Sequence, residues 1–229
     1  MEQGQSPDSP ISAGTGEALI ALPGAAALLI FAWLARQAAL GRAPAWDASI
    51  RHSIHRRSSG PLTAAMKLAT QLGSTYIVIP VGMIAVWRLL EAGRWRAAAV
   101  LAVAAAGAEI IGQFLKVVIR RKRPAPFFGL TEPFATSFPS THAMVSICFY
   151  GGLAAILSAN SPSLLVKAGL WIAAVIFSLA IGFSRVYLGV HYPSDVVGGY
   201  AAAVAWVFCL RAGYAKWIAI KKPGASKLP

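Results

Sequence analysis

The sequence of 229 residues has few charged residues, very few acidic ones and only two cysteines. Charged residues make up 13% and hydrophobic residues 57%, which excludes a disordered chain and is too apolar for an ordinary soluble domain. Cys148 and Cys209 lie inside apolar segments without CxxC spacing, so they indicate neither a disulfide framework nor a zinc site. Eight acidic residues stand against 21 lysines and arginines. Because the basic residues gather at the ends of apolar segments, they favour anionic lipids over nucleic acid as partners.

Apolar residues fall in six long segments, 18–35, 68–87, 97–115, 143–158, 164–183 and 196–210. A helix of about 20 residues crosses a bilayer, and a shorter one suffices where Lys or Arg at its ends reaches the headgroups. We therefore predict an all-α integral membrane bundle of six transmembrane helices over residues 18–211. Residues 1–17 are predicted to form a loose polar tail and residues 212–229 a basic tail. No basic region precedes the first segment, so we expect no cleaved signal peptide.

The connection between the first two predicted spans, residues 36–67, is long and basic. Ile50 and Ile54 are one helical turn apart within a stretch that also contains Arg51, His52, His55, Arg56 and Arg57. This pattern is typical of an interfacial helix with its apolar side towards the membrane and its basic side towards headgroups. A solvated basic loop fits the same residues equally well.

With six antiparallel spans, four polar segments lie on one face of the membrane: 116–123, 140–142, 184–185 and 191–195. Polar residues are costly beside a membrane and mark functional sites. Lys116 and Arg123 are seven residues apart and share a face if their helix continues, until Pro124 stops or kinks it. Glu109 lies a further seven residues before Lys116. It either braces the site or is a hydrogen-bonded residue of the bundle.

The residue types in these segments suit chemistry on a phosphoryl group. Lys116, Arg123 and Arg185 supply the cations that several anionic oxygens need. His142 and His191 can divide the roles of general acid and nucleophile, and Asp195 can hold one ring nitrogen of His191 and leave the other free. Since three cations repel a metal ion, we expect no metal site.

Each segment also has a purely structural interpretation. The basic run 116–123 is compatible with a simple membrane flank. Ser140 and Thr141 are compatible with a helix cap, and so is the pair His191 and Asp195 at the start of the sixth span. The convergence of all four segments favours a catalytic site.

In three parts the chain resembles the signature of the type 2 phosphatidic acid phosphatase superfamily, namely Lys116-x6-Arg123-Pro124, Pro139-Ser140-Thr141-His142 and Ser184-Arg185-x5-His191-x3-Asp195. The family's middle motif usually has Gly where this chain has Thr141. Six spans are similar to the membrane-bound branch of the family, the lipid phosphatases. Soluble acid phosphatases and vanadium haloperoxidases share the motif.

This resemblance implies a mechanism without metal or other cofactor. His191 attacks phosphorus and forms a phosphohistidine, Asp195 orients it, and His142 protonates the leaving group. Lys116, Arg123 and Arg185 hold the phosphate oxygens together with donors of the Ser140–Thr141 segment. The resemblance also implies cytoplasmic termini in the inner membrane of a bacterium and a site on the outer, periplasmic face. The numbers of Lys and Arg on the two faces do not decide this orientation once the three site cations are set aside.

We therefore predict a membrane lipid phosphatase that acts on a lipid phosphate or diphosphate. Undecaprenyl diphosphate is the leading substrate, because small bacterial members of the family often recycle that carrier, and phosphatidic acid and phosphatidylglycerol phosphate follow. One alternative is a phosphotransferase that passes the phosphoryl group to a lipid or sugar hydroxyl. Another is a transporter or scaffold that binds phosphate without chemistry. Nucleic-acid binding is disfavoured, because no soluble surface accommodates a duplex.

Overall fold

The computed structural model describes residues 11–130, 136–159 and 161–221, which form eight helices and no strand. The helices are α1 (Ile11–Ala39), α2 (Ala45–Arg56), α3 (Gly60–Leu72), α4 (Thr75–Glu91), α5 (Trp95–Ile119), α6 (Thr141–Ala159), α7 (Leu164–Tyr187) and α8 (Pro193–Lys221). Helices satisfy every backbone hydrogen bond within the segment, as a chain inside a bilayer requires. The predicted all-α class is confirmed.

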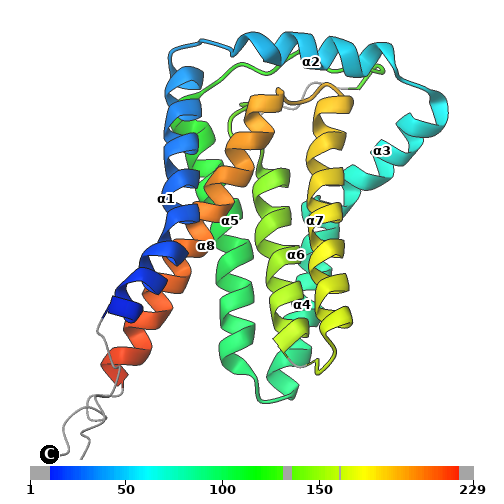
Figure 1. Cartoon of the computed structure of the whole chain (residues 1–229). Helices are drawn as coiled ribbons and strands as arrows, with labels where there is room; N and C mark the ends of the chain where they lie inside the picture. Colours follow the sequence, from blue (N-terminus) through cyan, green and yellow to red (C-terminus); the bar gives the residue numbers. More distant parts are fainter. Residues whose placement is uncertain (1–10, 131–135, 160, 222–229) are drawn as a thin grey trace, which may run out of the picture.

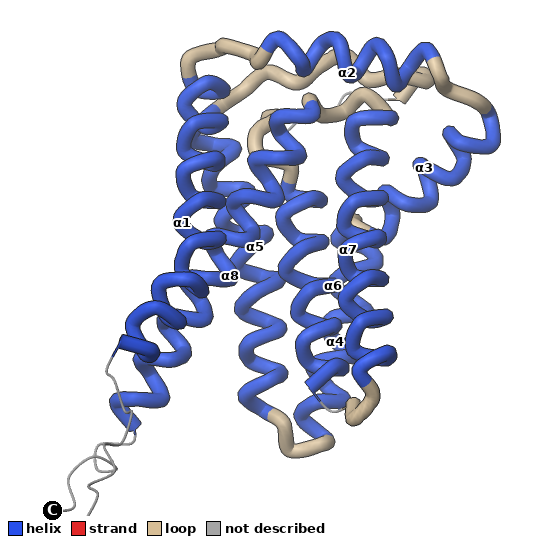
Figure 2. Tube along the Cα trace, viewed as in Figure 1, coloured by secondary structure: helices blue, strands red, loops and turns tan. Residues whose placement is uncertain are grey.

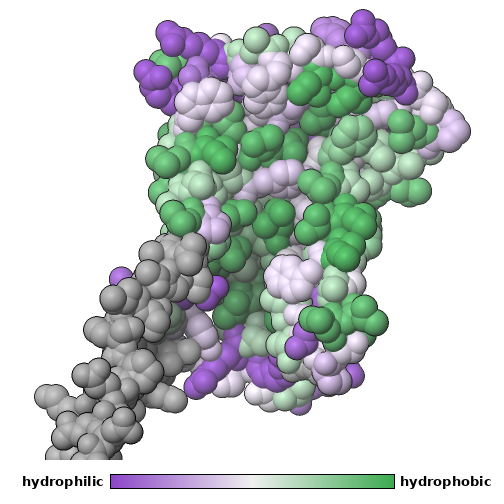
Figure 3. All heavy atoms as spheres, viewed as in Figure 1, coloured by the Kyte–Doolittle hydropathy of each residue, from purple (hydrophilic) through white to green (hydrophobic). Residues whose placement is uncertain are grey.

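Five of these helices, α1, α5, α6, α7 and α8, are long and apolar enough to cross a membrane. The pair α3 and α4 makes a sixth span if its two parts, which meet at an angle of 46°, count as one. Large apolar side chains such as Ile110, Phe114 and Leu179 are exposed along the sides of the bundle. Figure 3 shows these apolar flanks between hydrophilic patches at the two ends of the molecule. This distribution fits a bundle surrounded by lipid tails.

The second predicted span, 68–87, is wrong as a continuous helix, because α3 ends at Leu72 and α4 begins at Thr75. Glycine is a poor helix former, and Gly73 stands at the break. The hydroxyl of Ser74 donates to the carbonyl oxygen of Gln71 at 2.7 Å and so competes with the helical hydrogen-bond ladder.

Helix α2 lies across one end of the bundle, where the sequence predicts an interfacial helix (Figures 1 and 2). Ile54 packs against residues of α7 and α8, including Val186 and Val196, and not only towards lipid. Arg51 departs from the expected headgroup-facing side, since its guanidinium donates to the carbonyl oxygens of Ala125 and Gly189. The helix is thus anchored to the loops beneath it.

The bundle extends beyond the predicted limits of 18 and 211 at both ends. Helix α1 begins at Ile11, and α8 continues to Lys221. The continuation of α8 has a physical reason in its aromatic contacts, because the ring of Trp217 lies 6.3 Å from that of Trp95 and 5.8 Å from that of Tyr214. The remaining parts of the two predicted tails, residues 1–10 and 222–229, lie outside the described residues, so the division of the chain into one bundle and two tails stays a prediction.

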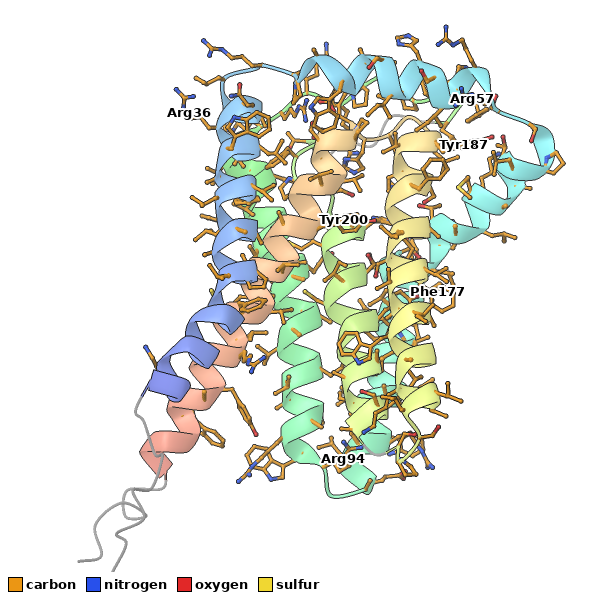
Figure 4. All side chains as sticks on the ribbon, in the orientation of Figure 1. Arg36, Arg57, Arg94, Phe177, Tyr187 and Tyr200 are labelled. Carbon is orange, nitrogen blue, oxygen red and sulfur yellow. The ribbon has the colours of Figure 1, made fainter. Side chains whose placement is uncertain are left out.

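Helix α6 lies at the centre and packs against α5, α7 and α8. The apolar core there includes Leu101 and Ala108 of α5 with Met144 and Phe149 of α6. Alternating directions place the end of α5, the start of α6, the end of α7 and the start of α8 together, beneath α2 and opposite the end of α8 (Figure 1). Arg36 and Arg57 lie at the α2 end and Arg94 at the other end (Figure 4).

Candidate active site

The four polar segments predicted to share one membrane face meet beneath α2. All eight predicted site residues lie there, on the end of α5 and its following loop, the start of α6, the end of α7 and the start of α8: Lys116, Arg123, Ser140, Thr141, His142, Arg185, His191 and Asp195. The backbone N–H of Ser140 donates to the carbonyl oxygen of Asp195 at 3.0 Å, which ties the starts of α6 and α8 together. This close approach requires Gly199, because a Cβ there would lie 2.5 Å from the Ser140 oxygen.

His191 is fixed through both ring nitrogens. It precedes α8, which begins at Pro193 as predicted, so that Asp195 lies in the first turn. His191 Nδ1 lies 3.3 Å from Asp195 Oδ2, and Nε2 lies 3.1 Å from Arg123 Nη1. The carboxylate therefore selects the tautomer with the proton on Nδ1, and the lone pair of Nε2 points towards the cations.

The electrostatics around His191 favour its neutral, nucleophilic form. The side chain is 1% exposed. Burial lowers the pKa of His191 to about 3, and the positive charges of Arg123 and Arg185 act in the same direction, while Asp195 opposes them. At neutral pH the imidazole is therefore unprotonated.

Lys116 lies on helix α5 and Arg123 on the loop that follows it, so the expectation that both share a helix is wrong. Helix α5 ends at Ile119, because Arg120 adopts a left-handed conformation with φ of 54°. Lys116 Nζ donates to Thr141 Oγ1 at 3.1 Å. Arg123 comes from the following loop, where Nη1 also donates to the carbonyl oxygen of Val190 at 2.7 Å. Both cations are buried.

Two polar atoms of the site are buried without a hydrogen-bond partner among the described residues. These are Ser140 Oγ and Arg185 Nε. The other end of the Arg185 guanidinium donates from Nη1 to Thr70 Oγ1 at 2.6 Å. Buried polar atoms are normally paired, and each of these two can donate one further hydrogen bond. An anionic oxygen would accept from both.

His142 is the second residue of α6 and is half-buried. The charges that act on it most strongly include Arg185, His191 and Lys116. Its position next to Ser140 and Thr141 places an imidazole at the edge of the cation cluster. The site thus brings together one oriented histidine, a second histidine and three cations.

Sequence reasoning missed several residues that support this site. Ser137 Oγ donates a short hydrogen bond to Asp195 Oδ2, Arg121 pairs with Asp195, and Thr70 holds Arg185. Asp47 of α2 pairs in turn with Arg121. Arg121 and Ser137 stand beside motif residues, and that proximity was the available signal. Nothing in the local sequence marks Thr70 or Asp47.

The carboxylate of Glu109 accepts a hydrogen bond from Gln113 Nε2 at 2.7 Å, one turn along α5. Of its two interpretations, the hydrogen-bonded bundle residue is the one that the contacts favour. A groove of about 1270 Å³ between the far ends of α5, α6, α7 and α8 contains none of the predicted site residues. Within the described residues, no three His, Cys, Asp or Glu side chains converge as metal ligands.

Known proteins are similar to this chain in sequence and in fold. Phosphatidylglycerophosphatase B of Bacillus subtilis is 36% identical over 103 residues, 44% of this chain and only 50% of that protein's length. An undecaprenyl-diphosphatase of Sulfolobus acidocaldarius is 30% identical over 154 residues, 64% of this chain and 67% of that protein. The crystal structure of a transmembrane PAP2-type phosphatidylglycerolphosphate phosphatase from Bacillus subtilis matches with a TM-score of 0.75 and 27% identity, covering 84% of this chain and 96% of that one.

The match to the PAP2 superfamily spans residues 97–218. That range is more than half of the chain and contains all the residues that meet beneath α2, except those contributed by α2 and α3. By this match, the chain belongs to the PAP2 superfamily.

Proposed function

We propose that the protein is a membrane lipid phosphatase that works through a phosphohistidine on His191. The observation that carries the proposal is the geometry of His191, with Nδ1 held by Asp195 and Nε2 directed towards Arg123. An unprotonated, oriented imidazole facing buried cations is arranged to attack an anionic phosphorus centre.

In the first step, Nε2 of His191 attacks phosphorus in line with the leaving oxygen. The new P–N bond forms as the P–O bond to the lipid breaks, and His142 gives its proton to the leaving oxygen. A positioned general acid is worth roughly 10²–10⁴ in rate. Asp195 stabilises the positive charge that develops on the ring of His191.

In the second step, water attacks the phosphohistidine from the side that the lipid has left. His142 accepts the proton of that water, the P–N bond breaks, and inorganic phosphate leaves with His191 restored. With a diphosphate substrate, the lipid leaves the first step as a monophosphate. The two steps balance without a metal ion or another cofactor, so none is proposed.

The equatorial oxygens of the phosphoryl group would occupy the space among the cations. Lys116, Arg123 and Arg185 compensate their charge, and the unpaired Ser140 Oγ and Arg185 Nε would gain acceptors there. Thr141 supports this arrangement through its bond to Lys116.

Lipid phosphates are the proposed substrate class, with membrane lipids as the surroundings. The two named relatives, a phosphatidylglycerophosphatase and an undecaprenyl-diphosphatase, support this class. Undecaprenyl diphosphate is the leading candidate, followed by phosphatidic acid and phosphatidylglycerol phosphate. We further propose a cytoplasmic membrane location with the site on the outer face.

Phosphate release by detergent-purified protein from these lipids, with EDTA present, tests the proposal. Wild type is expected to turn over at least one of them, and His191→Ala is expected to lose activity by at least about 10³-fold, because it removes the nucleophile. Activity retained by His191→Ala would contradict the nucleophile assignment. Loss of wild-type activity in EDTA, restored by a divalent ion, would contradict the metal-free mechanism. Release that requires an added lipid or sugar hydroxyl would indicate phosphotransfer instead.

A further inference from the structure

Asp47 is a buried carboxylate on a helix that lies outside the membrane spans. It belongs to the first turn of α2, whose last turn is basic, and its side chain is 1% exposed. Burying a charged carboxylate is costly unless it is paired and hydrogen-bonded. Its partners therefore indicate what Asp47 is for.

The Asp47 carboxylate is bound by two segments of the active site. Arg121 Nη2 donates to Oδ2 at 2.8 Å. Ser194 donates from its backbone nitrogen to Oδ1 at 2.9 Å and from its hydroxyl to Oδ2 at 2.5 Å. Ser194 is the neighbour of Asp195, so Asp47 of α2 fixes the first turn of α8.

Arg121 bridges the two carboxylates. While Nη2 contacts Asp47, Nη1 donates to Asp195 Oδ1 at 2.5 Å. The guanidinium carbon also lies 4.3 Å from the centre of the Tyr192 ring, which fixes the plane of the side chain. Asp195 uses its other oxygen to contact His191. A continuous chain of contacts thus runs from α2 through Arg121 and Asp195 to His191.

The positive and negative charges along this chain of contacts are unequal in number. One guanidinium serves two carboxylates, so the group of Asp47, Arg121 and Asp195 carries a net charge of −1 when all three are ionised. All three side chains are buried, where charges interact more strongly than in water. Any change of charge at Asp47 or Arg121 therefore alters how strongly Asp195 holds the positive charge that develops on His191.

We propose that Asp47 and Arg121 are positioning residues that fix Asp195 and set its electrostatic hold on His191. This proposal rests on the function proposed above and makes α2 a part of the catalytic machinery. The side chains of Asp47 and Arg121 bind each other, Ser194 and Asp195, so their loss is expected to lower kcat and leave KM nearly unchanged.

A pH profile separates this role from simple anchoring of α2. The groups that face His191 are Asp195 of α8, Arg123 of the loop after α5, and Arg185 of α7, and His142 of α6 lies nearby. From α2 the charges nearest Asp195 are Asp47 and Arg51. Wild type and variants are compared with one lipid, so that the titration of the substrate is common to all.

Asp47→Asn removes a negative charge, which lowers the pKa of His191 and moves the acid limb of kcat/KM to lower pH. Arg121→Gln removes a positive charge, which raises that pKa and moves the limb to higher pH. Each shift is expected to be about 0.5–1 pH unit, with kcat about tenfold lower. In Asp47→Asn/Arg121→Gln the charges removed have opposite signs, so the limb is expected to return towards that of wild type.

Arg51→Lys is the matched control, because it weakens the anchoring of α2 to the loops at Ala125 and Gly189 while it keeps the positive charge that acts on Asp195. Its acid limb is expected to stay where it is in wild type. The double variant replaces a buried ion pair with two amides and so keeps the test informative if Arg121→Gln alone fails to fold.

Shifts of the two single variants in the same direction, or no shift in folded Asp47→Asn, would overturn the positioning role while the phosphatase function stood. So would a double variant whose limb stays at the position of folded Asp47→Asn. A wild type without phosphate release from any lipid would overturn the proposed function, and the positioning role would fall with it.

Discussion

Thr141 stands where the family's middle motif usually has glycine, and its side chain has two distinct contacts. The hydroxyl accepts from Lys116 Nζ at 3.1 Å, and the methyl group lies over Gly112 of α5. A Cβ at Gly112 would come within 2.5 Å of Thr141 Cγ2. The glycine on the facing helix therefore leaves room for the threonine side chain, whose hydroxyl gives Lys116 a hydrogen-bond acceptor.

We expect Gly112→Ala to lower phosphate release and the unfolding temperature, because its methyl group overpacks the site at a cost of about 1–3 kcal/mol. Thr141→Ser removes Cγ2 and keeps the hydroxyl, so Gly112→Ala/Thr141→Ser is expected to recover most of the loss. Gly151→Ala is the control, since nothing lies near a Cβ there. Equal losses in the single and double variants would contradict this packing account.

At the scale of elements, the bend between α3 and α4 has a consequence for the site. Helix α3 approaches α7 obliquely, and the hydroxyl of Thr70 near its end accepts a hydrogen bond from Arg185 Nη1 at 2.6 Å. The hydroxyl of Thr63, two turns earlier on α3, pairs instead with Tyr187 Oη at 2.8 Å. Tyr187 lies at the end of α7, near the junction of α2 and α3 (Figure 4). The bent helix thus orients Arg185, whose Nε has no hydrogen-bond partner among the described residues.

Thr70→Val is expected to lower kcat/KM by about tenfold or more, since a hydrogen bond to a charged group is worth about 1.5–3 kcal/mol. Thr70→Ser keeps the hydroxyl and is expected to retain activity. The matched control is Thr63→Val, which removes a hydroxyl from the same helix without touching the site. The measurement is phosphate release at several lipid concentrations. Similar losses in both valine variants would indicate that α3 acts through general packing.

At the scale of the whole molecule, the site and the end of α8 lie at opposite ends of the bundle (Figure 1). The exposed Arg57 marks the α2 end, and the exposed Ala92 lies in the turn between α4 and α5 at the other end. These two positions report on opposite faces of the membrane.

In a background without Cys148 and Cys209, Arg57→Cys is expected to react with a membrane-impermeant maleimide in intact cells. Ala92→Cys is expected to react only after permeabilisation, because the proposed orientation places it in the cytoplasm. Gel-shift labelling checks both, and the permeabilised sample controls for accessibility. The reverse pattern would place the site in the cytoplasm.

The sequence by itself determined the helical class, the gathering of the polar segments at one end and the His191–Asp195 pair. These features depend on local sequence or on the number of spans. A long apolar segment predicts a membrane-spanning helix, and the alternation of antiparallel spans predicts which helix ends meet. The four-residue spacing of His191 and Asp195 at the start of a helix predicts that the two side chains are in contact. Two interpretations of residues 36–67 were compatible with the sequence, an interfacial helix and a solvated basic loop, and the structure has a helix there, α2.

Only the tertiary structure decided which cation serves which partner. Arg120, Arg121 and Lys122 are alike in sequence, yet the left-handed turn at Arg120 directs Arg121 alone between Asp47 and Asp195. Thr70 likewise meets Arg185 only because α3 bends away from α4. Such pairs join segments more than seventy residues apart, and their free energy depends on burial and geometry that no local pattern contains.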